Sequence, residues 1–281
     1  MGSGKTSSLP TFIRTGIDLG QEYHLAVVIT EPNGVESLLD GVQLHAPKGM
    51  DCLPIERLHY CYIPPAVGTW KTMISTAKQV NTLKYSAITK LATARNQDFE
   101  QFIRVLENLN DFRDQRGDSL GAIDTWDTNW MLAIDSLSGI NKMARQLHTG
   151  TRPSIHQGEW GVSMAMVEQF FDQLVAVTKC YTCTCAHPTL ERDELTGTTQ
   201  YMPDFLGRKL SPKVPRIFSE VILQQRDDRK FTWATMQSRY SSLKARNLPL
   251  SSNLMPSFKP LVRAWQKRAK LVSQTPPTLS E

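Results

Sequence analysis

Gly2-Ser3-Gly4-Lys5-Thr6, at the start of the chain, is the stretch on which the interpretation of the fold depends. It matches the last positions of the pattern G-x-x-x-x-G-K-[ST], in which backbone N–H groups surround phosphates, the Lys reaches the β and γ oxygens and the hydroxyl ligates Mg²⁺. We therefore expect a nucleotide to bind at Gly2, Ser3, Gly4, Lys5, Thr6 and Ser7. The opening Gly of the pattern would fall two residues before Met1, so we expect the strand that feeds the loop to be missing from the chain. A flexible Gly/Ser leader is the alternative interpretation.

The length and composition are typical of a soluble globular protein. The chain has 281 residues, of which 40% are hydrophobic and 21% are charged. No apolar run approaches the ~18 residues that a membrane span requires, so we expect no membrane partner and no secretory signal. The five cysteines form an odd count without a framework spacing, which favours reduced thiols and a cytoplasmic location.

Positive charge is concentrated at the end of the chain. The segment from Arg229 to Glu281 contains ten Lys or Arg residues and one acid, a net charge of +9, whereas the first 228 residues carry −4. A basic segment on a mildly acidic body indicates a polyanionic partner, of which nucleic acid is the commonest.

Strand-like and helix-like stretches alternate along the chain, which predicts an α/β fold with a mostly parallel central sheet and helices on both faces. The predicted strands are apolar and rich in β-branched residues, as expected of strands buried on both faces; they are His24–Thr30, Leu58–Ile63, Trp130–Asp135 and Tyr181–Ala186. The predicted helices follow apolar periodicity or turn signals; they are Lys5–Ile17, Val35–Leu39, Thr69–Ala94, Asp98–Phe112, Trp160–Val177 and Leu261–Val272.

The last third of the chain is less regular. Residues Thr189–Pro215 lack apolar periodicity and are interpreted as a long loop, a feature that is more often functional than idle in a compact domain. Ile217–Gln224 and Phe231–Met236 are predicted to form a β-hairpin. We therefore expect one domain at residues 1–246, N-terminally incomplete, followed by a basic C-terminal extension at 247–281.

Asp135 supports the phosphate-loop interpretation. Nucleotide hydrolases with such a loop need a carboxylate at the tip of a nearby strand, where it fixes Mg²⁺ while the loop hydroxyl, here Thr6, binds the ion directly. The apolar run from Trp130 ends in this carboxylate. The two motifs in this order predict that ATP and Mg²⁺ are cofactors, with Thr6 and Asp135 as the metal ligands.

Three further stretches resemble the RecA-like ATPases. In that family a strand after the loop's helix ends in a catalytic Glu, the magnesium Asp is followed by Ser, and a later strand ends in a polar sensor before a DNA-binding loop. The matching stretches are Val27-Val-Ile-Thr-Glu31, Ala133-Ile-Asp135-Ser136-Leu137 and Thr184-Cys-Ala-His187. Where bacterial RecA itself has Gln, this chain has His187.

Further stretches look like a phage branch of this superfamily, which consists of small ATPases linked to single-strand annealing and recombination. The stretches that resemble it are Ala186–Glu191, Pro203–Leu210 and Lys213–Glu220, and the resemblance spans Gly2 to Arg246. It implies an ATPase that acts on single-stranded DNA. It also implies a homo-oligomer, a ring or a filament, with the nucleotide between subunits.

The resemblance assigns roles to individual residues. Lys5, Glu31 and His187 would be catalytic, with Glu31 as the general base and His187 as the phosphate sensor. The alternatives are an ordinary turn residue for Glu31 and a strand-end histidine bonded to backbone for His187. The DNA contacts would be Arg208, Lys209, Lys213 and Arg216, with Tyr201 or Phe205 stacked on bases; a solvated loop is the alternative. Lys244 and Arg246 are candidates for a cation that completes a neighbour's site.

Two other function classes remain open. One is a motor or packaging-type ATPase, and the other is a nucleic-acid-binding module with a degenerate nucleotide pocket. The cysteines do not indicate a metal centre, because alternation along a strand places Cys183 and Cys185 on one face and Cys180 on the other. No second ligand pair follows at zinc spacing, so these residues are predicted to be core thiols.

Overall fold

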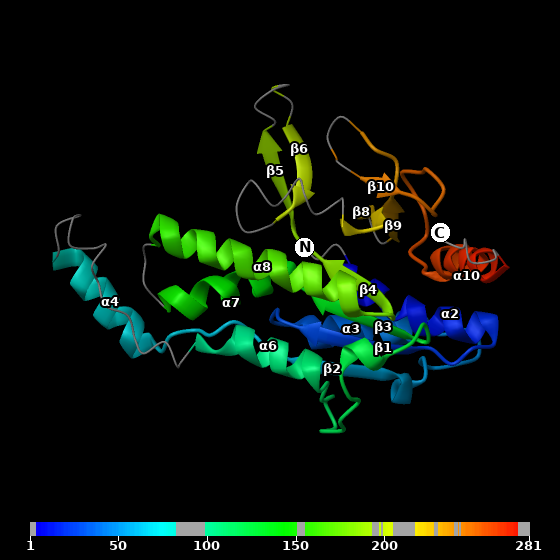
Figure 1. Cartoon of the computed structure of the whole chain (residues 1–281), viewed down its shortest axis with the longest axis horizontal. Helices are drawn as coiled ribbons and strands as arrows, with labels where there is room; N and C mark the ends of the chain where they lie inside the picture. Colours follow the sequence, from blue (N-terminus) through cyan, green and yellow to red (C-terminus); the bar gives the residue numbers. More distant parts are fainter. Residues whose placement is uncertain are drawn as a thin grey trace, which may run out of the picture.

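A four-stranded parallel sheet forms the centre of the molecule (Figure 1). The computed structural model describes residues 4–82, 99–150, 155–192, 197, 199–204, 217–227, 230–238, 241 and 243–274. The strands are β1 (His24–Ile29), β2 (Leu58–Tyr62), β3 (Trp130–Asp135) and β4 (Tyr181–Cys185), in the spatial order β2-β1-β3-β4. Each lies within one residue of its predicted bounds. The α/β class and the parallel central sheet are therefore confirmed.

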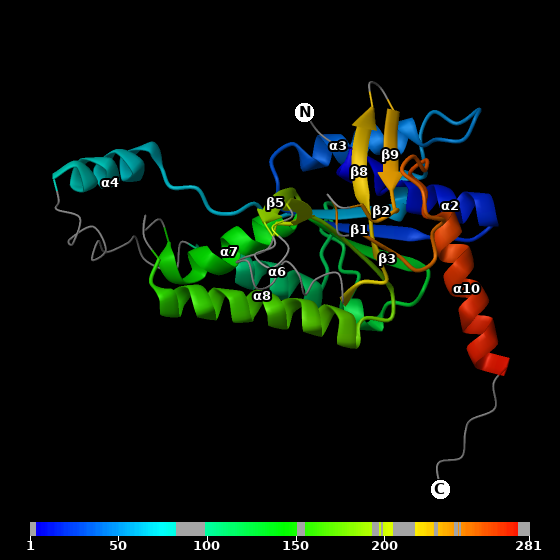
Figure 2. The ribbon, with the colours of Figure 1, turned by 90° about the horizontal axis from the view of Figure 1, so that it is seen from above.

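Helices cover both faces of the sheet (Figure 2). One face packs against α2 (Thr11–Leu19), α3 (Gly34–Leu44) and α10 (Lys259–Gln274), and the other against α6 (Gln101–Asn110), α7 (Leu137–Thr149) and α8 (Gln157–Val177). Side chains of a strand alternate between the two cores, as the period of two requires. Leu132 and Ile134 of β3 join the α7–α8 core, whereas Met131 and Ala133 join the α2–α3 core.

The helix predicted at Lys5–Ile17 is wrong in one respect, because it is broken in two. A short helix, α1 (Lys5–Ser8), ends before Pro10, and α2 begins at Thr11. Proline has no N–H to donate and its ring clashes with the preceding turn, so a single helix cannot pass through it unbent. The break leaves α1 as a separate short helix, which packs against α3.

The helix α4 (Trp70–Thr82) projects from the body on the segment between β2 and α6 (Figures 1 and 2). It is the first part of the helix predicted at Thr69–Ala94; residues 83–94 lie outside the described part of the chain. Its large apolar side chains face solvent, with Trp70 79% exposed and Met73 62% exposed. Two 3₁₀ turns, η1 (Ile55–Arg57) and η3 (Ile123–Thr125), complete the connections in this half of the molecule.

The region after β4 contains strands where a long loop is predicted. β5 (Pro188–Arg192) and β6 (Thr199–Pro203) pair as an antiparallel hairpin that rises from the body (Figure 1), so the loop interpretation of Thr189–Pro215 is wrong for these residues. The hairpin buries little apolar surface, and backbone hydrogen bonds hold it instead. For that reason its sequence carries no hydrophobic alternation to detect.

Four more strands follow. β7 (Glu220–Val221) pairs with β10 (Lys244–Ala245), and β8 (Leu223–Asp227) pairs with β9 (Lys230–Ala234). The predicted C-terminal hairpin exists, but its strands have different bounds. Arg226 and Lys230, which lie between the two predicted strands, are part of β8 and β9. Charge is compatible with these positions because β8 and β9 extend past the body into solvent (Figure 2).

The C-terminal helix α10 joins the α2–α3 core. Leu261 and Val262 are buried beside Phe12 of α2, and Lys259 forms an ion pair with Asp18 at 2.9 Å. Most of its remaining basic residues are exposed. Within the described residues, no helix is long and apolar enough to cross a membrane.

Close contact between α3 and α1 depends on a glycine. A Cβ atom at Gly41 would overlap the carbonyl oxygen of Ser7. Because backbone atoms cannot move aside as a flexible side chain can, any larger residue must separate the two helices. Gly41 therefore holds α1, and with it the Lys5–Thr6 pair, against the body.

We predict that Gly41→Ala lowers the free energy of unfolding by about 1–3 kcal/mol, the usual cost of overpacking. The matched control is Gly161→Ala in α8, where a Cβ atom meets nothing within 4 Å. That substitution should raise the free energy of unfolding by about 0.5–1 kcal/mol, because alanine loses less backbone entropy in a helix. Urea denaturation measures both values, and equal effects of the two substitutions would contradict the packing role of Gly41.

Candidate active site

The carboxyl edge of the parallel sheet brings together the polar residues that the sequence singles out. Glu31 lies just beyond the end of β1, Asp135 ends β3 and His187 lies just beyond β4. The N-terminus of α1 reaches the same edge, because Thr6 contacts Asp135. Gly2 and Ser3 lie outside the described residues, so the structure places Gly4, Lys5, Thr6 and Ser7 of the predicted loop.

Thr6 and Asp135 are joined directly. The Thr6 hydroxyl donates to Asp135 Oδ2 at 2.6 Å, although 129 residues separate them in the sequence. Asp135 is only 2% exposed, and this burial is the main reason that its pKa is raised above the ordinary value. The Thr6 hydrogen bond and the charge of Lys5 act in the opposite direction. A buried carboxylate beside a hydroxyl and an ammonium group is suited to neutralisation by a cation.

Gly4 gives the loop its geometry. Its backbone φ is +79°, in the left-handed region that favours glycine, and α1 begins at the next residue. The Ser7 hydroxyl donates back to the Gly4 carbonyl at 3.0 Å and so closes this first turn. Ser7 thus supports the loop in this structure.

Glu31 and His187 form a second pair at the same edge. His187 Nε2 lies 2.6 Å from Glu31 Oε1, and the Ser136 hydroxyl donates to the same oxygen. Both ionisable side chains are part-exposed, 31% for Glu31 and 48% for His187, so solvent or a ligand can reach them. His187 therefore contacts a carboxylate with its side chain, and its carbonyl accepts from the Asp204 N–H at 2.7 Å.

Thr30 fixes the two acidic residues relative to each other. Its N–H donates to the Asp135 carbonyl at 2.7 Å. Its hydroxyl accepts from the Ser136 N–H at 2.9 Å and donates to the Ser136 carbonyl at 3.0 Å. A Cβ atom at Gly139 would overlap this hydroxyl, so the start of α7 presses directly on it. The ends of β1 and β3 therefore form one rigid unit.

The β8–β9 hairpin contributes residues that sequence reasoning missed. The Phe231 ring lies on Gly4, where an added Cβ atom would come within 2.5 Å of it, and the Arg226 guanidinium lies 5.6 Å above the same ring. Gln224 accepts a hydrogen bond from Ser8 at 3.0 Å. The charged run Arg226–Lys230 is visible in the sequence, but its pattern alone does not show that the hairpin contacts the predicted phosphate loop.

The predicted DNA and trans-acting residues lie elsewhere. Arg208, Lys209, Lys213 and Arg216 fall outside the described residues. Lys244 is in β10, and its ammonium group donates to the Phe218 carbonyl at 2.7 Å. Arg246 is exposed just after β10.

The cysteines near the site behave as core thiols. Cys180 and Cys185 are buried and Cys183 is half-buried. Burial raises the pKa of Cys180 to about 11, while hydrogen bonding with Cys183 and burial raise the pKa of Cys185. In the described part of the chain no group of three or more His, Cys, Asp or Glu residues is arranged to hold a metal ion.

The oxygens of Thr6 and Asp135 nevertheless fit Mg²⁺. This ion prefers oxygen ligands and is usually held by one or two carboxylates together with phosphates and water, without a dedicated protein cage. One buried carboxylate and one hydroxyl at 2.6 Å supply the protein's share of such a set.

No family model matches the chain, and a search of curated proteins returns no match.

We predict that Asp135→Asn stabilises the protein at pH 8 and that the gain shrinks as the pH falls. The pKa of Asp135 is higher in the folded than in the unfolded chain, so its favourable contribution is present at low pH and is lost as the pH rises through the folded pKa. Asparagine keeps an acceptor for Thr6 and removes the charge. Thermal unfolding across pH measures this, with exposed Asp172→Asn in α8 as the control. A gain that grows toward low pH would contradict it.

Proposed function

We propose that the chain is a Mg²⁺-dependent ATPase of the RecA-like kind that acts on single-stranded DNA. The Thr6–Asp135 hydrogen bond supports this best, because it joins the two motifs that such an enzyme needs at one edge of a parallel sheet. Ligands of open parallel sheets bind at this carboxyl edge. Lys5, Glu31 and His187 lie around the same point.

The residues of α1 would hold the phosphates. Lys5 would offer an ammonium group at the start of α1, and the backbone N–H groups of this first turn would bind phosphate oxygens. Thr6 and Asp135 would hold Mg²⁺. When bound, that ion neutralises charge on the phosphate oxygens during transfer.

Glu31 is the proposed general base. A carboxylate in this role takes a proton from the attacking water, which requires that it be oriented and reachable. Ser136 and His187 bind one oxygen of Glu31 and leave the other available. Because His187 also accepts a backbone hydrogen bond from Asp204, a change at the nucleotide can pass to the segment that follows β6.

The β5–β6 hairpin favours a single-stranded nucleic acid as the partner. It begins at Pro188, directly after His187, and it exposes Leu190 (59%) and Tyr201 (41%). An exposed aromatic ring can stack on unpaired bases of any sequence. Arg208, Lys209, Lys213 and Arg216, on the segment after this hairpin, would bind phosphates.

The oligomeric state, the biological process and the location are proposed from the family resemblance. The chain would form a ring or filament in which Lys244 or Arg246 approaches a neighbour's nucleotide, and it would serve phage recombination or strand annealing in the cytoplasm of the bacterial host. A motor or packaging-type ATPase would instead show translocation on duplex DNA. A nucleic-acid-binding module with a degenerate pocket would bind DNA and hydrolyse nothing.

We predict that Lys5→Ala and Glu31→Gln fail in different ways. Lys5→Ala should weaken ATP binding, because the ammonium group contacts the ground-state phosphates. Glu31→Gln should leave ATP binding near normal and lower the hydrolysis rate by about 10²–10⁴-fold, the usual contribution of a general base. Calorimetry and phosphate release with single-stranded DNA separate the two effects.

Glu107→Gln in α6 is the control for loss of one carboxylate far from the sheet edge, and it should behave like the wild type. Wild-type hydrolysis by Glu31→Gln would refute Glu31 as the base. Single-stranded DNA that fails to raise hydrolysis by the wild-type chain would refute the proposed DNA dependence.

We predict that DNA binding is insensitive to sequence and weakens steeply with salt. Released counterions make log K fall by about 0.7 per phosphate neutralised on single strands. Replacing Lys209, Lys213 and Arg216 together by Ala should flatten this slope. The matched control replaces Lys71, Lys78 and Arg104, which lie on α4 and α6. Filter binding across salt concentrations measures the slopes, and equal slopes for the two triple variants would show that the predicted residues do not contact DNA.

A further inference from the structure

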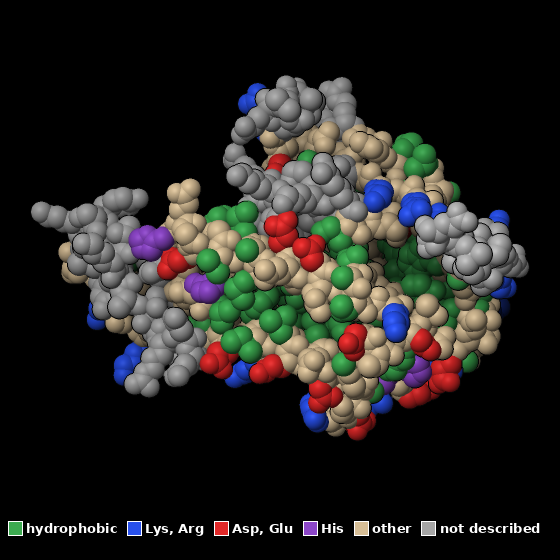
Figure 3. Space-filling view, viewed as in Figure 1, with side chains coloured by type: hydrophobic (Ala, Val, Ile, Leu, Met, Phe, Trp, Pro, Cys, Tyr) green, Lys and Arg blue, Asp and Glu red, His purple; other side chains and the backbone are tan. Residues whose placement is uncertain are grey.

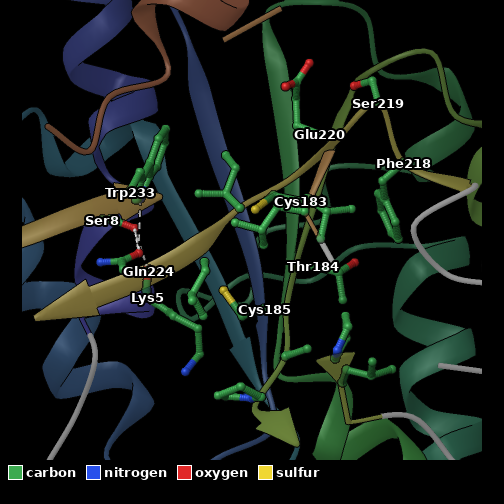
Figure 4. A pocket seen from close by; sticks show the side chains of 18 of the residues that line it. Lys5, Ser8, Cys183, Thr184, Cys185, Phe218, Ser219, Glu220, Gln224 and Trp233 are labelled. Atoms are coloured by element: carbon green, nitrogen blue, oxygen red, sulfur yellow. Dashed lines mark hydrogen bonds between the residues drawn. The ribbon is translucent and has the colours of Figure 1, made fainter. Parts of the chain in front are cut away.

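Polar groups gather at both ends of the central sheet. At the carboxyl edge, the candidate site borders a cavity of about 260 Å³ that Lys5 and Cys185 help to line (Figure 4). At the amino edge, His24 begins β1 and His59 lies in β2, and neither lines that cavity. Figure 3 shows a histidine among acidic side chains at this end of the molecule (purple and red, lower right). The proposed ATPase chemistry involves neither His24 nor His59.

A chain of hydrogen-bonding groups links His24, through His59, to a buried carboxylate. His24 Nδ1 lies 3.3 Å from His59 Nε2, and His59 Nδ1 lies 3.0 Å from Asp114 Oδ2. The side chain of Asp114 has no exposed surface and that of His59 is 7% exposed, whereas that of His24 is 24% exposed. The chain of groups therefore leads from a ring that solvent can reach to a carboxylate in the interior.

Asp114 is held in its charged form. Burial acts to raise its pKa, but hydrogen bonds from His59 and from the N–H groups of Arg116 and Asp118 outweigh burial and hold the pKa below its ordinary value. Those two N–H groups donate to Asp114 Oδ1 at 2.9 and 3.2 Å, and Arg116 Nε lies 3.8 Å from Oδ2. Because a charged carboxylate only accepts hydrogen bonds, His59 Nδ1 carries the hydrogen in the bond to Asp114.

Aromatic stacking fixes the positions of both imidazole rings. The His24 ring stacks on Trp130, the first residue of β3, with ring centroids 4.6 Å apart, and the His59 ring lies 5.2 Å from the same tryptophan. Trp126 extends the stack, 4.6 Å from Trp130. Since β1 pairs with β2 on one side and with β3 on the other, this cluster joins the amino ends of three strands.

The bond to Asp114 determines how many protons the two rings can share. With both rings neutral, His59 Nε2 carries no hydrogen and accepts from His24 Nδ1. One added proton keeps every contact, because His59 then donates from both nitrogens and the hydrogen of His24 moves to Nε2, 3.6 Å from Glu22 Oε1. A second added proton places hydrogens on both facing nitrogens and like charges on both rings, so the 3.3 Å contact cannot persist.

The surrounding charges make His24 the second ring to be charged. Burial lowers the pKa of His24, and the neighbouring His59 lowers it further. Arg57 acts in the same direction, whereas Glu22 and Asp127 favour the charged ring. The side chain of Glu22 is 67% exposed, so water screens much of its attraction. The first added proton therefore belongs on His59, which is bonded to a buried carboxylate, and the second on His24.

We propose that His24 and His59 form a proton-sensitive contact, which holds the amino ends of β1 and β2 together with at most one added proton and separates when a second proton binds. His24 is the more exposed ring, so it is the one that leaves for solvent. Its departure also breaks the stack on Trp130. Acid therefore loosens the sheet at the end opposite the candidate site.

The first test measures urea unfolding from about pH 8 to pH 5 for the wild type and for His24→Gln. The unfolded chain takes up the His24 proton first, so the wild type loses stability as the pH falls through the ordinary histidine pKa of about 6.5, and the loss ends below the lowered folded pKa. Glutamine keeps a donor for His59 and does not titrate. The unfolding equilibrium constant of the variant should therefore rise less on acidification, by up to about tenfold per pH unit, the limit for one proton.

His148→Gln in α7 is the matched control. The His148 ring lies 3.3 Å from the sulfur of Met166, on a helix remote from the amino ends of β1 and β2. This substitution also removes one titrating ring, and it should leave the pH dependence of unfolding close to that of the wild type.

The second test uses the unmodified chain with isotope-labelled histidine, because NMR of the ring nitrogens reports both the charge and the position of the hydrogen. We expect the first proton to charge His59 while the hydrogen of His24 moves from Nδ1 to Nε2, and the second proton to charge His24. Amide hydrogen exchange of residues 24–26 and 58–60, corrected for the intrinsic effect of pH, should become about tenfold faster or more with the second step only. The His24→Gln variant assigns the ring signals.

Three results would overturn the proposal. Equal pH dependence of unfolding in the wild type and His24→Gln would mean that His24 does not confer acid sensitivity. Charging of both rings without faster exchange at residues 24–26 and 58–60 would mean that the sheet does not depend on their contact. A charge on His24 while His59 stays neutral would reverse the assigned order. If His24→Gln does not fold, NMR and exchange of the wild type decide alone. None of these measurements uses ATP or DNA, so they are independent of the proposed ATPase activity.

Discussion

The hydrogen bond from Thr6 to Asp135 is the interaction on which the site depends, because it joins the first helix to the central strand. Asp135 is buried, and its carboxylate is placed where water cannot stabilise its charge. The Thr6 hydroxyl and the Lys5 ammonium group stabilise this charge, and the backbone unit formed by Thr30 and Ser136 holds the end of β3 in place. A carboxylate, a hydroxyl and an ammonium group therefore meet at the carboxyl edge of the sheet.

Close packing brings the surrounding elements to this edge. Three glycines allow contacts that a side chain would block: Gly41 against Ser7, Gly139 against Thr30 and Gly4 against Phe231. Each contact joins elements distant in sequence, so the site is assembled by tertiary structure and not by any single motif. Since interiors are close-packed, small changes at these positions should displace the groups of the candidate site as well as lower stability.

The sequence predicts the sheet well because buried parallel strands are continuous apolar runs, and a polar residue at or after the end of each run predicts the carboxyl edge; Glu31, Asp135 and His187 follow this rule. It does not predict contacts that depend on three-dimensional register. The bond from Ser136 to Glu31 and the placement of Phe231 over Gly4 involve residues whose local sequence is ordinary. Pro10 interrupts the helix predicted at Lys5–Ile17, and the residues of the β5–β6 hairpin are exposed or half-buried, so no apolar run marks these strands in the sequence.

The projecting helix α4 has a consequence for how the protein behaves in solution. Trp70, Met73 and Ile74 stand in water on an element that packs little against the body, and isolated helices of this length are only marginally stable in water. Covering such side chains releases free energy, so the same surface promotes both orderly assembly and precipitation. Solubility and any self-association through α4 are therefore coupled. A solvent that stabilises the exposed apolar side chains of α4 also weakens any complex that buries them.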